Sequence, residues 1–269
     1  MAANRKLWIA ALVCAAATTV GVTGCGKGDD TGAKGGGTTS PSAAPTKEAP
    51  KDPFAGMDAD AIADKATEAT KKATSLHMIG GGKNDGADMK VDFAVDERGA
   101  CTGKMTQQGA TAEMLKAEGQ LYMKGNEKFW RTTAGGKGGS AEETNAMVEL
   151  LKGRWMKVSG KDKDMGEVCD LDSLRKDMEK DKSDTKGATR GPDSEVNGQP
   201  AAVLTNKKSG GESVTMYVAK EGEPYILRVV ETGGDEPGTV TLTDYNKPVN
   251  ATKPPADQVI DLEKLGGRS

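Results

Sequence analysis

The sequence contains a single histidine, His77, among its 269 residues. Histidine-based catalytic triads, metal sites built from several histidines and the H-E-x-x-H motif are therefore excluded. The G-x-S-x-G turn of serine hydrolases is absent, and the glycine-rich run at 135–139 lacks the spacing of a phosphate-binding loop. We therefore expect no enzymatic activity, no catalytic residue, no metal and no cofactor, and we interpret His77 as structural.

Aromatic residues are also scarce, at 4% of the chain against 29% charged residues. The core must therefore rely on Val, Leu, Met and Ala. Without residues 1–24 the chain keeps 35 basic and 40 acidic residues, so it offers no basic face and nucleic acid is excluded as a partner. Residues 54–265 suffice for one folded domain, followed by a short tail at 266–269, and we expect a monomer.

The N-terminus has the layout of an export signal. Arg5 and Lys6 precede an uncharged apolar stretch at 7–20, which is too short for a convincing membrane-spanning helix. The stretch ends in Val-Thr-Gly-Cys at 22–25, which is similar to the lipobox of bacterial lipoproteins. We expect residues 1–24 to be a cleaved signal peptide and Cys25 to carry the lipid anchor. The alternative is an ordinary signal or short anchor helix that happens to contain a cysteine.

The residues after Cys25 agree with a tethered protein. Residues 25–53 are rich in Gly, Ser, Thr and Pro and have almost no large apolar side chain, so we expect a disordered, lipidated linker. A coil of this length spans on the order of 30 Å. The expected location is the extracytoplasmic face of the cell membrane.

Two cysteines, Cys101 and Cys169, remain in the folded part. Because an export signal places them where disulfides persist, we predict that they are bonded, while a pair of free buried thiols is the alternative. Their distance in sequence excludes a C-x-x-C redox motif.

Apolar periodicity predicts helices and strands in an α+β order. Helices are expected at 58–75, at 140–152 after the capping box Ser140…Glu143, and at 172–181. Residues 89–96 alternate cleanly as a half-buried strand. Further strands are expected around 101–105, 111–117, 120–124, 201–205, 213–219, 225–230 and 239–243, and short connections favour an antiparallel meander. The two hairpin-like runs at 122–130 and 217–225 look alike, which hints at an internal repeat.

Several segments, in this order, resemble the LppX/LprAFG family of actinobacterial lipoproteins, over about residues 57–265. They are ACTGKMTQQGATAEMLKAEGQLYMKGNEKFW (100–130), LLKGRWMKV (150–158), VCDLDSL (168–174), EVNGQPAAVL (195–204), MYVAKEGEPYILRV (216–229) and VTLTDYNKPVNATKPPADQVIDL (240–262).

The resemblance implies a LolA-like half-barrel, a curved antiparallel sheet with helices packed across its concave face. It also implies an apolar site for lipids or acylated glycolipids. The expected ligand-binding residues are Val91, Phe93, Met114, Leu121, Met123, Trp130, Trp155, Met216 and Leu227. Instead of binding a ligand, the tryptophans could pack in the core or at its edge. The methionines could simply fill a core that has few aromatic residues.

Two functions follow as hypotheses. The first is an anchored lipoprotein that binds lipids or acylated glycolipids in the cell envelope and transports them. The second is an anchored interaction or sensor-partner module whose half-barrel is filled by its own side chains. The two differ in whether the inward side chains face a gap or one another.

Overall fold

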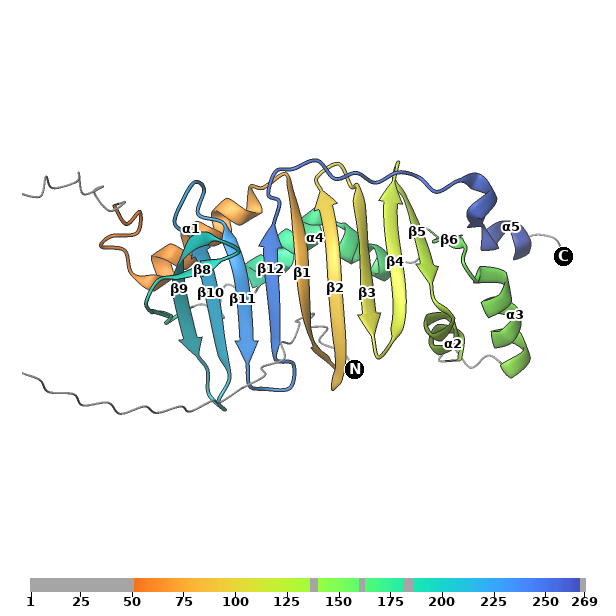
Figure 1. Ribbon diagram of the computed structural model, residues 1–269, viewed down its shortest axis with the longest axis horizontal. Coiled ribbons are helices and arrows are strands. Elements are labelled where there is room, and N and C mark those ends of the chain that lie inside the picture. Colours follow the sequence, from red (N-terminus) through yellow and green to blue (C-terminus); the bar gives the residue numbers. More distant parts are fainter. Residues whose placement is uncertain (1–50, 136–139, 160–162, 181–185, 267–269) are drawn as a thin grey trace, which may run out of the picture. The chain divides into compact units, whose positions relative to one another are not determined.

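The computed structural model describes residues 51–135, 140–159, 163–180 and 186–266 (Figure 1). All of the described helices and strands lie between Ala59 and Gly266, and the chain from Pro53 onward belongs to one unit of closely packed elements. The predicted signal peptide, Cys25 and most of the predicted linker lie outside the described residues.

The described strands are β1 Ser75–Asn84, β2 Ala87–Asp96, β3 Cys101–Gln107, β4 Ala110–Ala117, β5 Gln120–Gly125, β6 Trp155–Lys157, β7 Thr189–Arg190, β8 Ser194–Val196, β9 Gln199–Lys207, β10 Ser213–Ala219, β11 Ile226–Thr232, β12 Gly238–Thr243 and β13 Val259–Ile260. The α-helices are α1 Ala59–Lys71, α2 Glu127–Gly135, α3 Ala141–Leu151, α4 Leu171–Lys180 and α5 Leu262–Gly266, with 3-10 turns η1 Lys163–Cys169 and η3 Ala256–Gln258.

These strands form one sheet in the order β13-β6-β5-β4-β3-β2-β1-β12-β11-β10-β9-β7, and β8 pairs with β9. The sheet is open, because β13 and β7 at its two ends do not pair with each other. Adjacent strands in the sheet are antiparallel, except that β13 and β6 run parallel. The predicted α+β fold with a curved, mainly antiparallel sheet is confirmed, and the parallel pair is a departure from it.

Tight turns set the register of the meander. The β1–β2 turn is Asp85-Gly86 and the β3–β4 turn is Gln108-Gly109, and all four residues have positive φ angles of 50° to 81°. Two successive positive φ angles give the backbone twist that two-residue hairpins require, and glycine adopts them without steric cost. Side chains therefore alternate faces in phase from β1 to β5.

One face of the sheet is apolar and the helices pack against it. Figure 1 shows α1 and α4 on the same side of the sheet. The α1 helix begins at the N-cap Asp58, whose carboxylate accepts the backbone N–H of Ala61 at 2.7 Å. Its buried face, including Ile62 and Ala66, approaches β10 and β11. Small alanine side chains allow this close approach.

The segment after β12 passes over the ends of strands β1 to β4 on its way to α5 (Figure 1). Asn246 fixes its start, since its Oδ1 accepts the backbone N–H of Thr74 at 2.8 Å. At its end, Lys157 Nζ donates to Asp261 Oδ2 at 2.9 Å. This bond raises the pKa of Lys157 and lowers the pKa of Asp261. The contact therefore persists across neutral pH and holds β13 beside β6.

Several predicted elements are confirmed and one is wrong. The helices at 141–151, with its capping box, and at 171–180 lie within a residue of their predicted bounds. The hairpin expected at 122–130 is instead the end of β5 followed directly by α2. Asn126 causes the change, because its side chain accepts the N–H of Phe129 at 2.8 Å and so starts a helix. The likeness to 217–225, which is a true hairpin between β10 and β11, is therefore coincidental.

The predicted disulfide joins Cys101 on β3 to Cys169 at the end of η1. Both cysteines are fully buried in the apolar core. The bond therefore ties the segment that leads into α4 to the middle of the sheet, 68 residues away in sequence.

We expect the double variant Cys101→Ala, Cys169→Ala to lose about 4 kcal/mol of unfolding free energy, since the bond closes a long loop in the unfolded chain. Urea denaturation followed by circular dichroism measures this loss. Reduction of the wild-type protein should produce a similar loss. An unchanged midpoint in both experiments would show that the disulfide does not stabilise the fold.

Candidate functional site

Most of the residues predicted to bind a ligand lie together on the apolar face of the sheet. They belong to one cluster of buried side chains and are between 0% and 8% exposed. These residues are Val91, Phe93, Met114, Leu121, Met123, Trp130 and Met216. Strands β2, β4, β5 and β10 and helix α2 contribute them, so the cluster depends on the whole sheet and on no single segment.

The strand register arranges the cluster in rows. In one row Phe93 lies beside Gly103, Gly103 beside Met114 and Met114 beside Met123. Met156 on β6 extends the row. A wall of methionines is thus built across neighbouring strands, and methionine adapts its shape to irregular apolar partners.

Glycines within the rows make room for two aromatic rings. A Cβ on Gly103 would lie 2.2 Å from Phe93 Cδ1 and 2.4 Å from the backbone oxygen of Asp92. A Cβ on Gly125 would lie 2.4 Å from Phe129 and 2.9 Å from Trp130. Only glycine fits at these two positions while the rings lie against the sheet. These glycines were not predicted as site residues, although a glycine within an alternating strand indicates the close approach of another group.

The helices form the opposite wall of the cluster. Ile62 of α1, Leu151 of α3 and Leu171 of α4 are 0% to 3% exposed and belong to the same cluster. Leu174 and Met178 of α4 are only partly buried against it. These helical residues were not predicted as site residues, because the ligand contacts were expected on strands and tryptophans.

The predicted placement of Leu227 is wrong. A strict alternation put it on the same face as Met216, but the register of β10 and β11 shifts between Tyr217 and Val218. In this β-bulge Tyr217 pairs with Arg228 and Val218 pairs with Ile226. Leu227 consequently belongs to a small separate cluster with Val196, Ala201, Ala219 and Tyr217.

Trp155 also lies apart from the main cluster. Its ring is partly exposed, and Lys124 Nζ lies 5.7 Å from the ring centroid. The register of β5 and β6 places Trp155 and Lys124 on the face opposite Met123 and Met156. The expectation that Trp155 lines the apolar interior is therefore wrong, and its contact is a cation–π pair at the protein surface.

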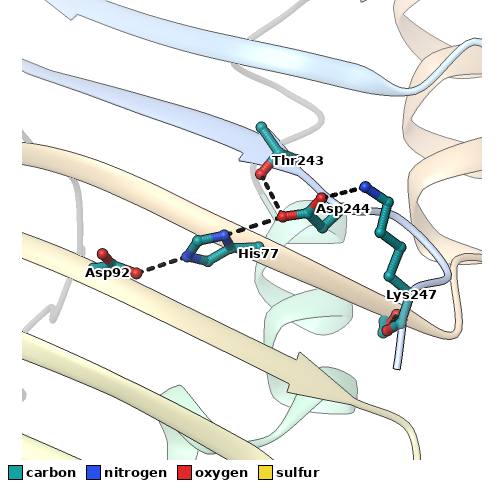
Figure 2. Close-up of polar contacts among 6 residues, drawn as sticks. His77, Asp92, Thr243, Asp244 and Lys247 are labelled. Carbon is teal, nitrogen blue, oxygen red and sulfur yellow. Dashed lines mark hydrogen bonds and ion pairs between the residues drawn. The ribbon is translucent and has the colours of Figure 1, made fainter. Parts of the chain in front are cut away.

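A polar cluster occupies the opposite face of β1 (Figure 2). His77 Nε2 lies 2.6 Å from Asp92 Oδ1 on β2, and its Nδ1 lies 3.4 Å from Asp244 Oδ2. Lys247 Nζ donates to the other oxygen of Asp244 at 2.6 Å. His77 thus joins β2 to the end of β12, which fits the structural role predicted for it.

The pKa of Asp244 lies below its ordinary value. The hydrogen bond from Lys247 is the largest cause, partial burial opposes it, and the contact with His77 adds to it. A lowered pKa in the folded state means that the ionised carboxylate stabilises the fold above the unfolded-state pKa of about 3.9. This contribution disappears as the pH falls through the folded-state pKa.

No group of three or more His, Cys, Asp or Glu side chains that could hold a metal ion occurs among the described residues. Within the same ranges no helix is long and apolar enough to cross a membrane.

We expect Lys247→Gln to raise the pKa of Asp244 toward its ordinary value. At pH 7 the variant should lose less than about 1 kcal/mol of unfolding free energy, because the ion pair is partly exposed. The two proteins should become equally stable once the pH has fallen through the folded-state pKa of Asp244. Carboxyl NMR titration together with denaturation at several pH values measures both effects. Lys83→Gln, on β1 but outside the cluster, is the control and should leave the Asp244 pKa unchanged. An unaltered Asp244 titration in Lys247→Gln would contradict the assignment.

The fold of this chain is similar to that of solved protein structures. Neither a protein-family model nor a curated protein matches the sequence. Among solved structures, LprF from Mycobacterium bovis is 15% identical, with a TM-score of 0.50 over 73% of this chain and 96% of LprF. The lipoprotein LppX from Mycobacterium tuberculosis is 16% identical, with a TM-score of 0.46 over 72% of this chain and 97% of LppX. The resemblance to the LppX/LprAFG family is therefore confirmed at the level of the fold, which this chain shares with LprF.

Proposed function

We propose that this chain is a membrane-anchored extracytoplasmic lipoprotein that binds lipids or acylated glycolipids by their acyl chains, between the apolar face of the sheet and the helices. In this proposal Cys25 carries the anchor and the linker to residue 53 holds the folded part away from the membrane. The role is binding and transfer of lipid between sites in the envelope, without catalysis.

One observation carries the proposal: a continuous apolar face that crosses many strands and is faced by helices. Methionines make up much of it, with Met114, Met123 and Met216 buried and Met105 and Met156 partly buried. Each methylene of an acyl chain buried there contributes about 0.8 kcal/mol. Flexible methionine side chains suit acyl chains of different length and saturation.

The covering helices are built so that they can separate from the sheet at modest cost. The buried face of α1 consists largely of alanines, with Ile62 as its one large aliphatic side chain. The α4 helix has Leu171 as its one buried residue. Such surfaces bury little apolar area per turn, so an acyl chain that replaces part of the contact can compensate for it.

The alternative function, an anchored interaction module, requires that the same side chains fill the interior permanently. The burial of the cluster in this structure is compatible with that arrangement, so a binding measurement must separate the two. A carrier takes up lipid in a fixed ratio, whereas an interaction module does not.

Native mass spectrometry of residues 51–269, expressed with an export signal in an actinobacterial host, tests the proposal. We expect an acylated adduct in a fixed ratio to the protein, which organic extraction then identifies. Ala112→Met, beside Gly125 on the apolar face, should reduce the adduct because it occupies interior volume. Ala94→Met, on the opposite face of β2, is the matched control and should retain it. A clean protein mass, together with no uptake of added phospholipid or fatty acid, would contradict lipid binding and favour the interaction module.

A further inference from the structure

Trp130 holds a buried hydrogen-bond donor that nothing in the described part of the chain accepts. The residue is 2% exposed, and its indole Nε1 has no partner there, with methionine sulfur counted among the acceptors. Buried polar atoms nearly always have partners, and an indole nitrogen can only donate. Phenylalanine, as at Phe129, would supply an aromatic ring at lower cost. A buried tryptophan without an acceptor for its N–H group is therefore unusual at this position.

The surrounding structure fixes the position of this ring. Asn126 Oδ1 accepts the backbone N–H of Phe129 at 2.8 Å and that of Thr111 at 3.1 Å, so the start of α2 is tied to β4. The rings of Phe129 and Trp130 meet edge to face, with centroids 4.9 Å apart. The Cε2 atom, which is bonded to Nε1, lies only 2.9 Å from the place that a Cβ on Gly125 would take. The donor is thus held against the apolar face of the sheet and away from water.

In the described ranges no side chain supplies an acceptor for Nε1 at this point of the sheet. Gly125 pairs with Ala112, so the backbone there belongs to the β4–β5 ladder. The neighbouring inward residues of the same row are Met105 and Val91, whose side chains carry no oxygen acceptor. Among the described residues nothing fills this role, which leaves a bound molecule to supply the acceptor for Nε1.

We infer that the Trp130 N–H binds a carbonyl oxygen of the ligand, so that the ligand is an acyl ester or acyl amide whose carbonyl lies beside Gly125 under α2. The inference rests on the proposed lipid binding and names its chemical class. A hydrocarbon offers no acceptor. A charged carboxylate or phosphate would lose its hydration in the apolar interior without a cationic partner, which costs far more than burying a carbonyl.

Binding of two probes to residues 51–269 tests the inference. Methyl hexadecanoate and octadecane have similar length, but only the ester carries a carbonyl; both are delivered from cyclodextrin. In Trp130→Phe the dissociation constant for the ester should rise about twofold to tenfold, the range for a lost net hydrogen bond, and that for octadecane should rise less. Trp155→Phe, the matched tryptophan on the opposite face, should change neither.

Nitrogen-15 NMR of the indole groups gives a second readout on the wild-type protein, which does not depend on the variant folding. Two indole signals are expected from residues 51–269, and Trp155→Phe assigns them. The Trp130 proton should shift downfield with the ester and not with octadecane. An unmoved signal with bound ester, or equal losses of both probes in Trp130→Phe, would overturn the carbonyl contact while lipid binding stands. Failure of both probes to bind the wild-type protein would overturn the proposed function itself.

Discussion

The structure depends on the burial of one face of an open sheet. Turns with two successive positive φ angles join β1 to β2, β3 to β4 and β4 to β5, and the strand pairing keeps every second residue on the same side. An apolar face of this extent cannot remain in water, and a sheet that does not close on itself must have it covered by other elements. Helices α1, α2, α3 and α4 provide the cover, and the disulfide between Cys101 and Cys169 attaches the segment before α4 to the sheet.

Much of this arrangement could be predicted from the sequence. The alternation at 89–96, the Ser140–Glu143 capping box and the two cysteines each indicated a local structure that the fold retains. Strand β1 was not predicted, because Gly80, Gly81 and Gly82 are poor strand formers in isolation. They are held in the strand by pairing with β2 and β12, which is a tertiary effect.

The site was predictable only as far as strict alternation holds. Phe93, Met114 and Met123 lie where their strand period puts them, whereas the bulge in β10–β11 moves Leu227 to the other face. A bulge adds one residue to one strand and leaves no clear mark in the sequence. Trp130 was predicted to bind a ligand, but its unpaired N–H could be recognised only once its surroundings were known. The Trp130 donor has no partner among the described residues, and it connects the packing of the interior to the choice of ligand.

We propose that acyl chains lie on the apolar face of the sheet beneath the helices. Photocrosslinking with a fatty-acyl ester that carries a diazirine near its methyl end, followed by peptide mapping, tests this location most directly. We expect labelled residues on the inward face, at positions such as Met114, Met123 and Met216. Labelling confined to the opposite face, at Tyr217 or Leu227, or no labelling above that of the unfolded chain, would contradict it.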